Sequence, residues 1–235
     1  EWKDYNAYSD FISSEGVPVF YARVDHVSVP LAQEGTGQVV VDFTPEPLTQ
    51  DVSFVFHIEK TADVVVDSLT AEISGIPSTM ELTTGLIPAQ KTYKLLFRPT
   101  YAALPSAADS ASAEALRCEA SVNIPGIVRS HTEDMVTGPG ILQIAIYTHY
   151  DYEEEGTQRK AAKVFHAGIN LYHTLKERKS LQWDEEENGY RQASRSITVE
   201  IGSPLNIDKD GILNGGSTST GLDQWIPGET FEIEV

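Results

Sequence analysis

Strict alternation of apolar and polar side chains is the feature that most constrains how this chain folds. In the segment "DVSFVFHIE", residues 51–59, Val52, Phe54, Phe56 and Ile58 fall on one face of an extended backbone. A period of two predicts a β-strand with one face in a core. Similar segments occur at residues 17–31, 38–43, 63–76, 91–99, 141–152, 196–202 and 230–235. Roughly a dozen such strands, without the spacing of βαβ units, predict an all-β fold of sandwich architecture.

Two further segments are ambiguous by composition. Residues 160–175, "KAAKVFHAGINLYHTL", contain Ala and Lys, which favour helix, but their side chains alternate better on strand spacing. Gly168 also disfavours a helix interior, so we expect a strand here. Residues 105–117, "PSAADSASAEALR", are rich in small residues. They are expected to form a flexible loop, or a short helix over "ASAEALR".

A polar segment punctuated by Gly and Pro separates the strand-like segments into two groups. It covers residues 125–140, with the sequence "PGIVRSHTEDMVTGPG". Domain boundaries fall preferentially in linkers of this composition. We therefore expect two sandwich domains, at residues 1–132 and 133–235.

The charge of the chain excludes some partners. Seventeen basic residues against 35 acidic ones give a net charge of −18, which repels nucleic acid and anionic lipid surfaces. No apolar run approaches the roughly 20 residues of a membrane helix. Cys118 is the only cysteine, so no internal disulfide is possible. With no His or Lys beside it in sequence, Cys118 is expected to be an inert thiol.

The sequence contains no familiar catalytic motif. Nucleophile elbow, H-E-x-x-H and phosphate-binding loop are all absent. His149, His166 and His173 lie on neighbouring predicted strands and could meet, although solvated imidazoles are the simpler interpretation. The acidic runs at residues 151–155 and 184–187 suggest a glycosidase pair, but both occupy turn-like positions. We therefore expect no catalytic residue and no cofactor; a hydrolase would need paired buried carboxylates or a histidine cluster.

Tyr147, Tyr150 and Tyr152 cluster at one strand end. They could form a carbohydrate-stacking platform, although packing or an interface is the commoner use of tyrosine there.

The stretch "NIDKDG" resembles the start of a calcium loop. Asn206, Asp208 and Asp210 alternate and are followed by Gly211, as in the first half of an EF-hand. The twelfth position is Ser217 rather than Glu, and the flanking Pro and Gly residues oppose helices. These three residues are therefore a weak calcium candidate at most. We expect a turn, with Asp supplying side-chain hydrogen bonds and Gly a positive φ.

Three segments carry a resemblance to a known family. They are "SLTAEISGIPSTMELTTG" (Ser68–Gly85), the closing segment Gly202–Val235 with its Gly-rich turn and Asp/Trp pair, and the acidic, aromatic start "EWKDYNAYSDF". Together, in their order along the chain, these segments resemble the fimbrillin-like lipoproteins of Bacteroidetes, within the type V pilus superfamily. Within that family they resemble a gut-bacterial subgroup of unassigned function.

The resemblance implies a fold, a location and a role. It implies two tandem transthyretin-like Greek-key β-sandwiches, export, a lipid anchor on a Cys preceding Glu1, and a place at the outer-membrane surface or in a fimbrium. The implied role is non-enzymatic: a pilus or adhesion protein assembled with other pilus or surface-protein subunits by strand exchange. A surface glycan-binding lipoprotein is the alternative. Fimbrial subunits of this family are cut after an early Arg, but Arg23 falls inside a predicted strand, which favours an anchor, tip or accessory protein.

The segment "TFEIEV" is the candidate assembly strand. Phe231, Ile233 and Val235 form its apolar face, which must meet a core of its own domain or a partner's. Trp225 and Pro227 are expected to fix the entry of the strand. Because a terminal strand is easily exchanged, we expect it to be an edge that accepts a partner strand or an element donated to a neighbour.

Overall fold

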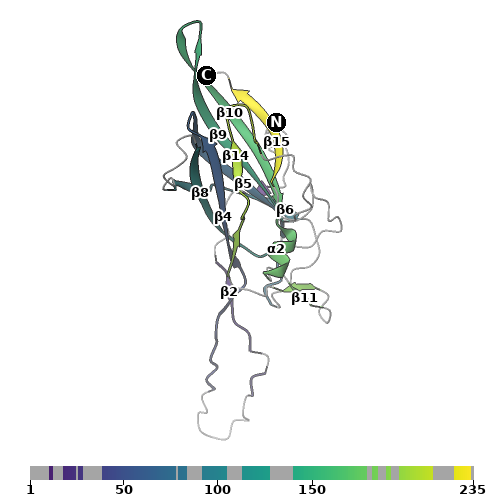
Figure 1. Ribbon diagram of the computed structural model, residues 1–235. Coiled ribbons are helices and arrows are strands. Elements are labelled where there is room, and N and C mark those ends of the chain that lie inside the picture. Colours follow the sequence, from purple (N-terminus) through teal and green to yellow (C-terminus); the bar gives the residue numbers. More distant parts are fainter. Residues whose placement is uncertain are drawn as a thin grey trace, which may run out of the picture.

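The computed structural model describes part of the chain in detail. The described residues are 11–12, 18–24, 26–28, 39–77, 79–83, 92–104, 113–127, 140–178, 182–184, 189–191, 196–213 and 225–233. Over these residues the protein is predominantly β and consists of several sheets, as Figure 1 shows. In the same part of the chain, no helix is long and apolar enough to cross a membrane.

The larger sheet has six strands in the order β1-β6-β5-β9-β10-β15. Its strands are β1 (Phe11–Ile12), β5 (Val64–Pro77), β6 (Thr92–Phe97), β9 (Ile141–Glu154), β10 (Thr157–Asn170) and β15 (Ile226–Ile233). All neighbours pair antiparallel except β1 and β6. The hairpin of β9 and β10 extends past the other strands, because β5 pairs with β9 only as far as Tyr150.

The second sheet has the order β13-β4-β8-β7, with β14 also on β4. Its strands are β4 (Gln50–Thr61), β7 (Thr100–Ala103), β8 (Ala113–Ile124), β13 (Ser196–Glu200) and β14 (Leu205–Ile207). β13 and β14 follow one another along the same edge of β4, and both run parallel to it. The remaining elements are the short pairs β2 (Phe20–Tyr21) with β3 (Glu46–Pro47) and β11 (Gln182–Asp184) with β12 (Gly189–Arg191), and the helix α2 (Tyr172–Glu177).

One hydrophobic core lies between the two large sheets. Val52, Phe54, Phe56 and Ile58 of β4 are all fully buried in it, which confirms the face predicted from their alternation. Phe54 stacks on Phe97 of the six-stranded sheet, with ring centroids 5.8 Å apart. Side chains from both sheets therefore interdigitate in the manner of a β-sandwich.

The prediction of two tandem sandwiches divided between residues 132 and 133 is wrong for the described residues. β5, from the first half, pairs with β9 from the second, and β4 pairs with β13 and β14. The core likewise contains residues from both halves, from Val52 to Trp225. The expected linker lies mostly outside the described residues. The physical reason for the error is that a Gly/Pro-rich connection between strands has the same composition as a linker between domains.

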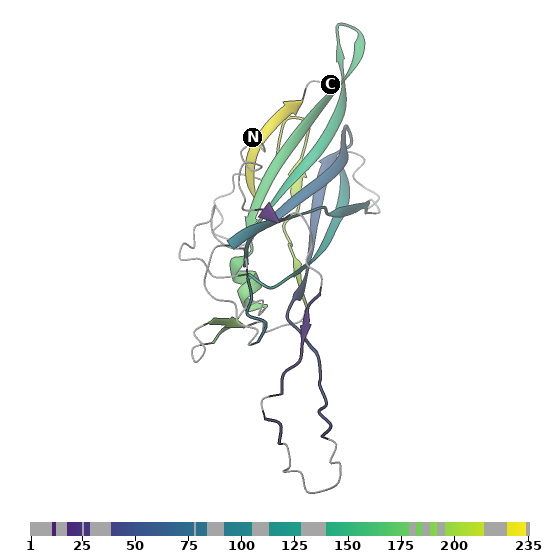
Figure 2. The same ribbon diagram turned by 180° about the vertical axis from the view of Figure 1, so that it is seen from behind.

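Three local predictions also need correction. The segment 160–175 is strand only to Asn170, whose side-chain oxygen accepts a hydrogen bond from the Tyr172 amide at 2.9 Å, where α2 begins. Residues 113–117 are neither loop nor helix but the start of β8, paired with the far end of β4. Within residues 17–31 and 38–43, Phe20–Tyr21 is the one described stretch in a strand. The other described residues there form an extended arm that leaves the end of the sandwich (Figures 1 and 2).

Candidate assembly edge

Strand β15 forms one edge of the six-stranded sheet. It pairs with β10 on one side, and among the described residues no strand pairs with its other side. Residues 228–230, Gly228, Glu229 and Thr230, are exposed. An edge of this kind presents backbone N–H and C=O groups to which another strand can be added. The expectation that this strand lies at an edge is therefore confirmed for the described residues.

The entry of β15 is fixed by a buried tryptophan. Trp225 is 2% exposed and packs edge-on against Phe56 of the opposite sheet, with ring centroids 5.8 Å apart. Its indole Nε1 donates a hydrogen bond to the Ser203 carbonyl at 2.9 Å. The side chain thus joins β15 to both the core and the loop after β13, as expected from the sequence.

The apolar face of β15 does not enter this core. Phe231 pairs with Val164, whereas its neighbour Phe165 is the core residue, so Phe231 lies on the opposite face of the sheet. There it packs edge-on against His166, with ring centroids 5.5 Å apart. The His166 ring Nδ1 lies 2.9 Å from the Glu229 carbonyl. The side chain of Ile233 and all of Val235 lie outside the described residues.

Close packing at Gly228 holds β15 against β10. A Cβ at this position would lie 2.9 Å from the Cβ of His166. The ladder between the two strands is irregular at the same point, with a register shift between Phe165 and Ala167. A larger residue at position 228 would therefore push β15 away from its only described neighbour.

A buried ion pair lies on the face of the six-stranded sheet that carries His166. The Glu72 side chain is 3% exposed, and its Oε1 accepts a hydrogen bond from Lys94 Nζ at 2.5 Å. Its other oxygen, Oε2, is buried without a hydrogen-bond partner. Desolvation raises the pKa of Glu72, while Lys94 and the charge of His166 act in the opposite direction. The sequence pattern did not indicate this ion pair, because Glu72 occupies an ordinary outward position in an alternating strand.

The three histidines are not brought together as one cluster. The His149 ring Nδ1 contacts both carboxylate oxygens of Asp67, at 2.8 and 3.0 Å. The strand register places His166 opposite Ala145, four residues along β9 from His149, which corresponds to about 13 Å. The side chain of His173 is not described. In the part of the chain that the structure describes, no group of three or more His, Cys, Asp or Glu side chains could hold a metal ion.

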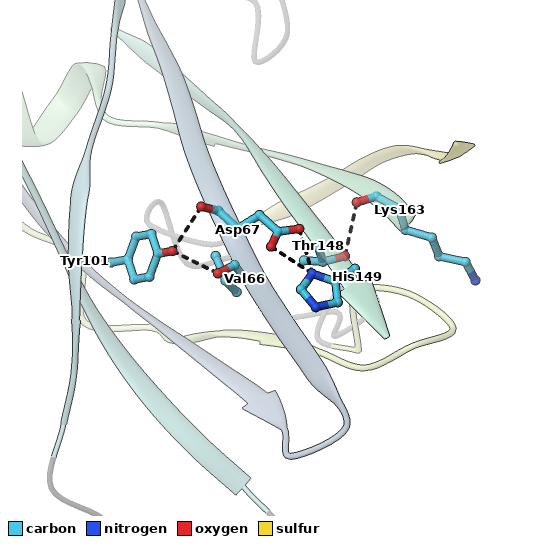
Figure 3. A network of polar contacts seen from close by, with 6 residues as sticks. All are labelled: Val66, Asp67, Tyr101, Thr148, His149 and Lys163. Atoms are coloured by element: carbon cyan, nitrogen blue, oxygen red, sulfur yellow. Dashed lines mark hydrogen bonds and ion pairs between the residues drawn. The ribbon is translucent and has the colours of Figure 1, made fainter. Parts of the chain in front are cut away.

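Asp67 reaches His149 because of a bulge in β5. The register against β9 shifts between Val66 and Ser68, so Asp67 is an extra residue. Tyr101 of the other sheet donates its hydroxyl to the carbonyls of Val66 and Asp67, at 2.8 and 3.2 Å. Figure 3 shows this contact beside the His149 pair and the Thr148 hydroxyl that donates to the Lys163 carbonyl. The bulge thus supplies acceptors through which the two sheets are tied at one side.

The stretch that resembles a calcium loop is a turn, as predicted. Asp208 Oδ1 accepts hydrogen bonds from the amides of Asp210 and Gly211, at 2.7 and 2.8 Å. Gly211 does not have the positive φ that was expected of it. The Lys209 carbonyl accepts a hydrogen bond from Lys163 Nζ at 2.8 Å. The turn is therefore tied to β10 through Lys163, and Asn206 precedes it in β14.

Tyr150 and Tyr152 lie side by side on the β9–β10 hairpin, but they do not form a flat platform. Their ring centroids are 6.2 Å apart and the planes are inclined by 49°. Lys163 Nζ lies 5.4 Å from the centre of the Tyr150 ring. Tyr147 falls on the other face of the strand by alternation. This arrangement offers packing and a cation–π contact rather than the coplanar aromatic surface that glycan stacking would need.

Two other sequence expectations concern single side chains. Cys118 is fully buried, and desolvation raises the pKa of its thiol to about 12, an environment that agrees with the expected inert thiol. Arg23 was predicted to lie inside a strand, but β2 ends at Tyr21, so Arg23 lies outside it. Arg23 is an exposed residue of the arm, so the argument against proteolytic cleavage at this site is wrong.

Comparison of the chain with protein-family models, with curated proteins and with solved structures finds no match.

Proposed function

We propose that this protein is a non-enzymatic structural or adhesion protein of the cell surface, of fimbrial type, which is assembled by strand addition at β15. The observation that carries the proposal is the outer edge of β15, which pairs with no other described strand and has exposed residues 228–230. A strand from a partner subunit would satisfy the backbone groups of this edge and extend the six-stranded sheet.

The anchoring of β15 supports this role. Trp225 holds the start of the strand in the core, and Gly228 allows close contact with His166. An accepting edge must be held in place before the partner arrives, since ordering it on binding would weaken the complex. β15 meets this requirement better than β7, which has four residues, all of them exposed.

The resemblance stated above supplies the remaining parts of the proposal. They are export, a lipid anchor on a Cys preceding Glu1, and a position at the outer-membrane surface or in a fimbrium. A transthyretin-like Greek-key order of strands is kept for one sandwich rather than two; consecutive strands β4 and β5 lie in different sheets, as is common in sandwiches. Because Arg23 is exposed, a protease could reach it, so we propose a stalk subunit as well as an anchor or tip protein.

Site-specific photo-crosslinking on intact cells tests the proposal. A photo-reactive amino acid replaces Thr230 in β15, and a matched variant carries it at Thr198, an exposed threonine in the edge strand β13. We expect high-mass adducts from position 230 only, together with digestion of the protein by protease added to intact cells. If position 230 gives no adduct, or if the protein is protected inside the cell, the proposal is wrong.

A further inference from the structure

The arm concentrates exposed apolar side chains. We define it as the described residues of segments 18–28 and 39–47. Large hydrophobic side chains exposed to solvent on the arm are Val19, Phe20, Val24, Val27, Val39, Val40 and Phe43. Among them Phe20, Val40 and Phe43 are 61%, 70% and 60% exposed. An exposed apolar cluster on a projecting element is typical of a contact surface.

The arm is fixed at its base and extended beyond it. At the base, β2 pairs with β3, the Leu48 amide donates to the Val19 carbonyl at 2.7 Å, and the Val19 amide donates to Thr49 Oγ1 at 3.2 Å. Beyond this base, the described residues of the arm belong to no sheet. The arm therefore offers extended backbone that is suited to joining the edge of a sheet.

The accepting edge is too far away in the same molecule. The arm leaves the sandwich at one end, whereas β15 lies toward the other, where the β9–β10 hairpin projects; both views show this (Figures 1 and 2). We propose that the arm of one copy adds to the β15 edge of a second copy of this chain. This inference rests on the proposed function and names the donor and the partner. The contact joins two different surfaces, so repetition produces a head-to-tail chain rather than a closed dimer.

Length and charge favour the first segment of the arm as the added strand. β15 has eight residues, or about 26 Å of strand, and residues 22–28, which lie beyond the base, span about 23 Å when extended. The second segment contains Pro45 and Pro47, which lack the N–H group that a ladder needs. The first segment carries one acidic and one basic residue, Asp25 and Arg23, whereas the second carries two acidic ones, Asp42 and Glu46. Since Glu229 is an exposed anion on β15, the first segment meets less electrostatic repulsion at this edge than the second would.

Disulfide trapping between separate molecules tests the pairing. Purified Val24→Cys chain is mixed with a size-tagged Thr230→Cys chain under mild oxidation, and the control mixture replaces Thr230→Cys with Thr198→Cys. The native thiol does not compete, because Cys118 is fully buried. We expect a disulfide-linked heterodimer in the first mixture and a background level in the control. Equal yields in the two mixtures would overturn the pairing.

Sedimentation of the full chain gives a second test. Val24→Ser combined with Val27→Ser, both in the first segment beyond the base, should weaken concentration-dependent self-association by on the order of tenfold or more, because two apolar side chains lose their burial at the contact. The melting temperature should stay unchanged, since both residues are exposed in the free chain. If the variant associates like the wild type while position 230 still gives adducts on cells, the arm is not the donor and the proposed function stands. If position 230 gives none, the proposed function fails as well.

Discussion

Replacing Trp225 with Ala should destabilise the whole sandwich. Its indole is 2% exposed, packs on Phe56 and donates to the Ser203 carbonyl. Truncating a buried tryptophan costs about 3–5 kcal/mol through lost burial and the cavity that remains. The unpaired Ser203 carbonyl adds about 1 kcal/mol. Domains are stable by only about 5–15 kcal/mol, so the variant should be marginally folded.

Urea unfolding followed by circular dichroism measures this loss, because the β-sheet signal does not depend on the substituted residue. Trp225→Phe keeps an aromatic ring against Phe56 but lacks the N–H donor, so it should lose about 1–2 kcal/mol. Phe43→Ala is the matched control: this ring is 60% exposed on the arm, and its removal should change stability by less than about 0.5 kcal/mol. If Trp225→Ala unfolds at the same urea concentration as the wild type, the view that Trp225 anchors β15 is wrong.

Four further predictions concern single sites. Burial raises the pKa of Glu72 above the value of 4.5 that it has when unfolded, so the folded state binds the proton of Glu72 more tightly. The contribution of Glu72 to the free energy of unfolding therefore falls as pH rises above about 4.5. Glu72→Gln should remove this pH dependence in urea titrations at several pH values, and a pH profile identical to that of the wild type would contradict the prediction. Tyr101→Phe should cost about 1 kcal/mol in the same unfolding assay, and no loss would show that the bond between the sheets contributes nothing. Calcium below millimolar concentration should not raise the melting temperature; a rise of several degrees that Asp208→Ala abolishes would refute this. Cys118 should react with a thiol reagent only on unfolding, so rapid labelling in native buffer would be evidence against its burial.

The strands themselves could be predicted from the sequence to a large extent. Alternation located β4, β5, β6, β9 and β13, because side-chain period reports directly which face of a strand is buried. It does not report which strand lies alongside. The pairing of β4 with β13 was therefore missed, and a punctuated connection was interpreted as a domain boundary.

The arm and the buried Glu72 show two other limits. Residues 17–31 contain many β-branched side chains, yet most of the described ones pair with no strand. β-propensity reflects how well a side chain fits a pleated, half-buried surface rather than an intrinsic preference of the backbone. Glu72 alternates outward like any solvated residue, but its face of the sheet is covered, since Ala145 and Val164 on the same face are also buried. Burial of that face depends on tertiary packing that the pattern of one strand does not report.

The parallel edge of β4 also determines when this protein can fold. During synthesis, β4 can pair with β8 once residue 124 has been synthesised. The other edge of β4 stays unpaired until β13 and β14 have been synthesised, and β14 ends only at Ile207. Until then a strand with four large apolar side chains has one unpaired side. Pairing between segments so distant in the chain is slow, and an unpaired strand edge invites association with other nascent chains. A chain interrupted before β13 would therefore be a target for chaperones and proteases rather than a smaller working unit.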